Sequence, residues 1–133
     1  MTARLAVASL LLVWTAGGTA PASAGGTATV ELTVRHSRFS PSALVVPHGT
    51  TVRFVVHNAD PIAHELIIGD AGLHARHEGG TERWHPPRPG EVSVDIASVA
   101  ETAFTFDRPG TVRFGCHLPG HWAYGMQGTV RVV

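Results

Sequence analysis

Short runs in which apolar and polar residues alternate recur through most of this chain. In the first run, Val30, Leu32 and Val34 alternate with polar or charged residues. Successive side chains of a β-strand point to opposite faces, so a period of two predicts strands with one buried face. The other runs with this period are 51–56, 66–68, 92–96, 104–106, 112–114 and 130–132. No long segment has the period of about 3.6 residues that predicts a helix, so we expect an all-β protein.

Clusters of turn-forming residues separate these runs. They are Pro47–Gly49, Asn58–Pro61, Pro89-Gly90, Pro109-Gly110 and Pro119-Gly120. Turns at such short intervals are typical of a β-sandwich or a β-barrel. The region 69–89 differs, because it is polar, rich in proline and carries several histidines. We expect one long irregular loop there, with a helical turn near residues 72–77.

The first 24 residues have the features of a secretory signal peptide. The apolar run Leu5–Trp14 follows a positively charged start, and Ala22-Ser23-Ala24 forms a cleavage signal. A bilayer needs about 20 apolar residues, more than this run provides. We therefore predict a cleaved signal peptide over 1–24 and one domain over 25–133. The protein would be periplasmic or extracellular, without stable membrane insertion; a retained membrane anchor is the alternative.

The net charge and the number of cysteines exclude some classes of protein. The formal net charge of +0 argues against a nucleic-acid-binding protein. The chain has one cysteine and nine histidines, so an intrachain disulfide framework is excluded. A lone thiol among many imidazoles points to metal binding or to thiol chemistry.

Three candidate metal ligands follow one another near the C-terminus. Cys116, His121 and Met126 are each separated by four residues, and they lie between two predicted strands. A loop between adjacent strands can bring such residues to one point. Thiolate, imidazole and thioether donors suit copper better than magnesium or calcium, which prefer oxygen. The blue-copper arrangement of two histidines, one cysteine and a weak axial methionine needs one more histidine.

Strand parity selects His64 as that histidine. Cys116 shares the inward parity of Phe114, and His64 shares that of Ile68, so both can point to the edge of the core. The other histidines near strands are excluded by outward parity or by a place in a turn: His36, His48, His57 and His117.

Three segments carry a resemblance to a known family: NADPIAHE at 58–65, FDRPG at 106–110 and CHLPGHWAYGMQGTVRV at 116–132. They resemble those of small bacterial cupredoxins, the type I copper proteins of the plastocyanin and azurin superfamily, over about residues 29–133. The resemblance implies a Greek-key β-sandwich and one type I copper site with four ligands: His64, Cys116, His121 and Met126. It also implies an apolar patch above His121 where a transient redox partner would dock, formed by Leu118, Pro119, Trp122 and Ala123.

One residue next to the predicted site departs from the family pattern. Glu65 follows the first histidine ligand, where azurin-like and rusticyanin-like proteins carry Asn or Ser. Polar groups around the ligands tune a metal centre, so this departure bears on its reduction potential.

Three functions compete on this sequence. The first is electron transfer by a monomeric copper protein with a transient redox partner. The second is copper tolerance or copper delivery on the same fold, for which the histidines of the region 69–89 are the local argument. The third is an enzyme with Cys116 as nucleophile, which leaves Met126 unexplained, so we expect no enzymatic activity.

The histidines of the region 69–89 have two interpretations of their own. His74 and His77 would share one face of a helical turn, where they could bind a second metal ion together. A solvated loop that contains His74, His77 and His85 is the interpretation we favour from the sequence.

Overall fold

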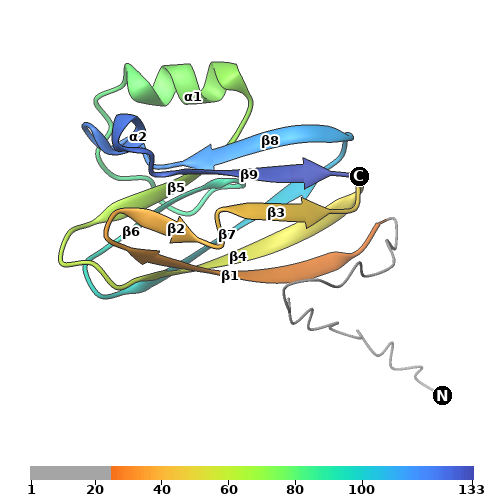
Figure 1. Ribbon diagram of the computed structural model, residues 1–133, viewed down its shortest axis with the longest axis horizontal. Helices are drawn as coiled ribbons and strands as arrows, with labels where there is room; N and C mark the ends of the chain where they lie inside the picture. The colour runs from red at the N-terminus through yellow and green to blue at the C-terminus, as the bar shows by residue number, and fades with distance from the viewer. Residues whose placement is uncertain (1–24) are drawn as a thin grey trace.

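The structure is a computed structural model that describes residues 25–133, so the predicted signal peptide at 1–24 lies outside the described residues. Two β-sheets pack face to face (Figure 1). The first has the strand order β2-β1-β4-β7, with bounds Arg38–Ser40, Thr27–Arg35, Thr50–Asn58 and Val99–Phe106. The second has the order β3-β9-β8-β5-β6, with bounds Ala43–Val46, Gln127–Val132, Gly110–Gly115, His64–Gly69 and Glu91–Val94. The described helices are α1 (Ala71–Glu78) and α2 (His121–Tyr124).

The chain changes sheet repeatedly as it proceeds. Strands β1 and β4 pair in parallel, as do β3 and β9, and the other neighbours pair antiparallel. Among the described residues, no strand ladder joins one sheet to the other. Of the two predicted architectures, the sandwich is therefore confirmed and the closed barrel is wrong.

Each predicted run contributes to a strand, with one error of extent. Strand β6 ends at Val94, and Ile96, which we expected on the inward face, is 54% exposed. The Asp95 carboxylate accepts a hydrogen bond from the backbone N–H of Ile96, and Ala97 has a φ of 50°, so the chain turns here. Strands β2 and β3 have only 3 and 4 residues, too few to produce a clear alternating pattern.

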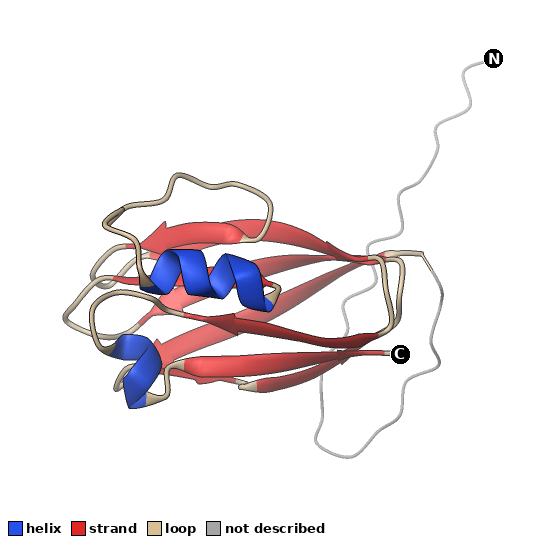
Figure 2. Ribbon diagram, turned by 90° about the horizontal axis from the view of Figure 1, so that it is seen from above, coloured by secondary structure: helices blue, strands red, loops and turns tan. Residues whose placement is uncertain are grey.

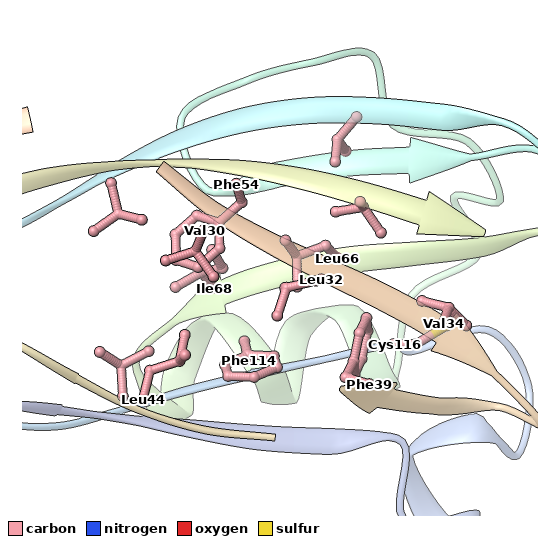
Figure 3. Close-up of a cluster of buried hydrophobic side chains, with 14 of the residues drawn as sticks. Val30, Leu32, Val34, Phe39, Leu44, Phe54, Leu66, Ile68, Phe114 and Cys116 are labelled. Carbon is pink, nitrogen blue, oxygen red and sulfur yellow. The ribbon is translucent and has the colours of Figure 1, made fainter. Parts of the chain in front are cut away.

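The inward faces of both sheets form one apolar core. Leu32 of β1, Ile68 of β5 and Phe114 of β8 meet in it, each with at most 1% of its surface exposed (Figure 3). Cys116 lies at one end of this core, near Phe39, with 0% of its surface exposed. The predicted site therefore begins where the apolar core ends.

Helix α1 covers the outward face of the second sheet (Figure 2). A Cβ atom at Gly69 would collide with the Leu73 side chain, so the absence of a side chain there lets the helix approach β5 closely. The Asp70 side chain caps the helix by accepting a hydrogen bond from the backbone N–H of Leu73 at 2.8 Å.

The helix is longer than the sequence predicted. We expected a long irregular loop with a turn at 72–77, whereas the helix spans 8 residues. The buried residue of this helix is His74, so the segment lacks the apolar stripe from which a helix is usually predicted. Within 25–133, the helices are too short and too polar to cross a membrane.

Candidate metal centre

The first two predicted ligands sit at the ends of neighbouring strands in the second sheet. His64 begins β5, and Cys116 follows the last residue of β8. Their side chains lie on the inner face with Ile68 and Phe114, as strand parity predicted. Both are closed off from solvent, with 1% of His64 and 0% of Cys116 exposed.

The third predicted ligand lies on a loop that folds back on itself. His121 opens the short helix α2, which is flanked by Gly120 and Gly125 at φ values of 82° and 98°. These positive φ values favour glycine, so the loop needs it at both turns. The backbone N–H of Met126 donates to the His121 carbonyl at 3.0 Å, and that of Cys116 donates to the Met126 carbonyl at 3.1 Å. The loop thereby returns Met126 to the start of the segment.

Three of the predicted ligands converge. The His121 Nδ1 atom lies 3.3 Å from the Cys116 Sγ atom and 3.3 Å from the His64 Nδ1 atom. One donor atom from each residue lies within 4.8 Å of the others. Ligands of one ion are separated by about 3–4 Å when the bonds to nitrogen and sulfur measure about 2.0–2.3 Å. The spacing therefore suits a single metal ion.

Asp60 orients His64 from the side away from the other donors. The His64 Nε2 atom lies 2.9 Å from an Asp60 carboxylate oxygen. With the ring proton on Nε2, His64 donates to this carboxylate and directs the lone pair of Nδ1 toward Cys116 and His121. The backbone N–H groups of His36 and Ser37 also donate to Asp60, at 2.6 and 2.8 Å. Nothing in the sequence marks Asp60 for this role, because Asp60-Pro61 is typical of a turn.

The protonation states follow from burial. Burial lowers the pKa of His64, although the hydrogen bond to Asp60 opposes the shift, so the imidazole is neutral and able to bind a metal. Burial raises the pKa of the Cys116 thiol to about 12. A metal ion displaces such a proton, because a coordinating thiol binds as the thiolate. Burial would also raise the pKa of Asp60, but the backbone N–H groups of Ser37 and His36 together with His64 outweigh it, and the pKa falls.

Met126 lies in the same buried cluster as Cys116, with 0% of its surface exposed. It is the last residue before β9, so the loop and the strand both fix its backbone. The thioether is the only sulfur that the loop adds to the thiol of Cys116. The structure thus places the fourth predicted ligand on the buried side of the loop.

His117 points to the opposite face of the sheet, as its parity predicted. Its ring stacks on Trp122, with centroids 4.5 Å apart and an interplanar angle of 16°. Its Nε2 atom lies 2.8 Å from the His74 Nδ1 atom, and its Nδ1 atom lies 2.7 Å from a Glu78 carboxylate oxygen. His74 is therefore engaged with His117 and does not form the alternative metal-binding pair with His77. The solvated loop that we favoured is also wrong, because His74 and His85 are buried.

Glu65 is buried on this outward face, beside the first ligand in sequence but on the other side of the sheet. It is 2% exposed, and its Oε1 atom accepts a hydrogen bond from the backbone N–H of His117 at 2.8 Å. Its Oε2 atom lies 3.1 Å from the His85 Nε2 atom. Glu65, the residue that departs from the family pattern, thus connects the strand of His64 to the histidines under α1.

Comparison with known proteins identifies the family. The model of a cupredoxin-like domain matches residues 7–132. A copper-resistant cuproprotein CopI of Rubrivivax gelatinosus is 34% identical over 116 residues, which cover 81% of this chain and 70% of that protein. Its counterpart from Pseudomonas aeruginosa is 28% identical over 136 residues, which cover 78% of this chain and 75% of that protein.

Solved structures share the fold. Auracyanin B superposes with a TM-score of 0.66 at 20% identity, covering 88% of this chain and 95% of that chain. Reduced auracyanin from Roseiflexus castenholzii also superposes with a TM-score of 0.66. The identity is 22%, and the match covers 85% of this chain and 99% of that chain. The sandwich, the family model and the relatives agree: this chain belongs to the cupredoxin-like family.

Proposed function

We propose that the protein is an exported type I copper protein that carries single electrons. The observation that carries the proposal is the convergence of a thiolate donor and two imidazole donors, from Cys116, His64 and His121, at one end of the core. Met126, buried on the same loop, would supply the weak axial contact. This set of soft sulfur and imidazole donors fits copper, whereas oxygen-seeking cations would find no carboxylate in it.

Bound by these residues, copper would supply a one-electron couple between Cu(I) and Cu(II). The chain's contribution is a ligand set that is largely in place before the ion arrives. His64 is held by Asp60, and the loop hydrogen bonds hold His121 and Met126. Buried walls exclude water from the sulfur of Cys116. A fixed and enclosed ligand set changes little between the two oxidation states, which favours rapid electron transfer.

The route to a partner would run through His121. It is the partly exposed member of the converging set, whereas His64 and Cys116 are buried. Pro119 and Ala123 are exposed around it, and they offer the small apolar surface that suits a transient redox partner. Trp122, which we expected in this patch, packs toward the outward face against Gly115 and His117. We expect the protein to act as a monomer in such encounters.

Copper resistance is the second candidate function. The two curated relatives are named as copper-resistant cuproproteins, and their identity extends over most of this chain. A copper-tolerance or copper-delivery role is compatible with the same centre, because holding a copper ion and transferring electrons through it use the same ligands.

The visible spectrum of the purified protein loaded with Cu(II) tests the copper centre. We expect an intense thiolate-to-copper absorption band, one copper ion in the type I site and reversible voltammetry. Copper bound without this band would contradict the type I site. To separate the two roles, the growth of a strain that lacks the gene should be measured with added copper and, separately, under conditions that require respiration. A growth defect confined to high copper would favour resistance over electron transfer.

A further inference from the structure

A second cluster of possible ligands lies on the outward face of the second sheet, under α1. It consists of His77 from the last turn of the helix, His85 from the following loop and Glu91 at the start of β6. The Glu91 Oε2 atom lies 3.6 Å from the His77 Nε2 atom and 3.7 Å from the His85 Nδ1 atom. The two imidazole rings have centroids 5.0 Å apart.

Each histidine turns one ring nitrogen into the cluster and the other toward an oxygen atom of the protein. The His77 Nδ1–H group donates to the backbone carbonyl of Leu73 at 2.9 Å, which leaves the lone pair of Nε2 toward Glu91. The His85 Nε2 atom lies 3.1 Å from the Glu65 Oε2 atom, a close contact that falls short of hydrogen-bond geometry. With the ring proton on Nε2, the lone pair of Nδ1 faces the cluster. Metal-binding histidines characteristically place their second ring nitrogen against a carboxylate or a backbone carbonyl.

The His85 Nδ1 atom supplies an independent sign of a missing ligand. His85 is 1% exposed, and within the described residues its Nδ1 atom has no hydrogen-bond partner. A buried polar nitrogen without a partner costs about 1–3 kcal/mol of stability. A bound ion at this point would satisfy it.

We propose that His77, His85 and Glu91 bind a divalent transition-metal cation such as Zn²⁺ or Cu²⁺. Two imidazoles and one carboxylate suit these ions, whereas Cu(I) prefers sulfur and Ca²⁺ prefers oxygen. Ligands around a tetrahedral ion with bonds of about 2.0–2.1 Å lie about 3.3–3.4 Å apart, close to the two distances from Glu91. The ligands therefore need only small adjustments to hold the ion.

The surroundings allow entry and further coordination. A surface cavity of about 260 Å³ is lined by His77 and Glu82, so solvent reaches the cluster on the side of His77. The Glu82 Oε2 atom lies 3.5 Å from the His85 Nδ1 atom, and its half-exposed side chain can supply a fourth ligand. The Arg88 guanidinium lies 3.9 Å from Glu91 and 3.5 Å from Glu82. Because Arg88 is itself half-exposed, it can turn into solvent when a cation binds.

Glu65 connects this site to the proposed copper centre, and this step rests on the proposed function. One carboxylate oxygen faces His85, and the other accepts the backbone N–H of His117, the residue after Cys116. A cation bound through His85 polarises Glu65 and adds positive charge behind the thiolate ligand. Positive charge favours the reduced copper, so the cation raises the reduction potential, and reduced protein binds the cation more tightly in return.

Zinc binding to the purified, copper-loaded protein tests the site. We expect the wild-type protein to bind one Zn²⁺ per chain by calorimetry and metal analysis. His77→Ala and Glu91→Gln should lose that zinc while keeping the thiolate-to-copper band, which also reports that they are folded. His48→Ala, which removes an exposed histidine far from the cluster in sequence, is the matched control and should bind zinc normally.

The same measurements can overturn the site. A wild-type protein that binds no Zn²⁺, or variants that bind it as the wild type does, would remove the assignment. The Cys116→Ser protein and its Glu91→Gln double variant separate this inference from the proposed function. A difference of one zinc between them supports the second site even if no type I copper centre forms.

The connection through Glu65 is tested by the copper centre's potential. We expect Zn²⁺ to raise the reduction potential of the wild-type protein and to bind the reduced form about fivefold more tightly than the oxidised form. Glu65→Gln keeps an acceptor for His117 but removes the charge, so it should diminish both effects. Equal zinc affinity in the two oxidation states would refute the connection and leave the zinc site standing.

Discussion

At one end of the second sheet, adjacent residues place different kinds of metal-binding side chains on the two faces. On the inner face, His64 and Cys116 point into the end of the apolar core with His121. On the outer face, Glu65 and His117 point under helix α1. The inner cluster combines imidazole with sulfur, and the outer cluster combines imidazole with carboxylate.

This difference shows how a strand separates two kinds of donor over a single residue step. Side chains alternate across the sheet, so neighbours in sequence are shielded from each other by the backbone layer. Soft donors gather where the core is apolar, and carboxylates gather where a polar helix covers the sheet. One chain can thus hold two metal preferences without mixing their ligands.

Replacement of the thiol gives the largest contrast between the faces. We expect Cys116→Ser to lose the thiolate-to-copper band completely, because the absorption requires the sulfur. Glu91→Gln, on the outer face, should retain the full band. Visible absorption of both copper-loaded variants checks this, and a band that survives in Cys116→Ser would show that the inner ligand set is wrongly assigned.

Loss of the group that orients His64 should weaken copper binding on the inner face. Asp60→Asn removes the charge that fixes the Nε2 proton, and such changes cost about 10- to 100-fold in metal affinity. Competition with a copper chelator measures the effect. Glu101→Gln, which breaks an exposed ion pair with Arg53 on the other sheet, is the control and should leave the affinity unchanged.

Packing on the outer face can be disturbed at Gly115. A Cβ atom there would lie 2.5 Å from the Trp122 ring, so Gly115→Ala should displace the indole from the sheet. We expect a loss of about 1–3 kcal/mol in the free energy of unfolding, the usual cost of overpacking. Gly72→Ala, whose Cβ would meet nothing nearer than 3.4 Å, is the control for denaturant unfolding. Equal stability of Gly115→Ala and the wild type would contradict the close packing.

The smallest expected effect is a loss of stability in acid that originates from His74 on the outer face. Burial lowers the pKa of His74 below 6.5, so the unfolded chain takes up this proton before the folded chain does. The free energy of unfolding should therefore fall as the pH drops below about 6.5, and this group should have no influence above that pH. Denaturant unfolding of copper-loaded protein measures the trend. His74→Gln should flatten it, and an unchanged slope would assign the trend to another group.

Alternation predicted most of what lies on the strands. It placed Cys116 and His64 on the inner face and His117 on the outer face, because a period of two fixes direction from sequence alone. It could not reveal Asp60, whose role depends on contacts with His36 and Ser37 across 24 and 23 residues. The ligation by the four predicted residues stays a prediction until copper is bound.

The outer face was the part that the sequence did not reveal. The helix that builds it buries histidine where most helices bury apolar residues, so the pattern resembled a loop. The solvated loop that we favoured for these histidines was wrong, because His74 and His85 are buried. The alternative pair of His74 and His77 does not form either, because tertiary contacts turn His74 to His117 and His77 to His85. Glu91 gave no signal at all, since it joins the cluster only through the pairing of β6 with β5.

The register of β5 has a consequence for how a correctly folded molecule could be recognised. Ile68 pairs with Phe114, which sets His64 inward and Glu65 outward. A slip of one residue would exchange them and place a carboxylate where the imidazole belongs. Such a molecule would lack the ligand set that gives a blue-copper protein its colour. The absorption of a preparation therefore counts the chains whose strand pairing is right, and colour becomes a direct assay of folding fidelity.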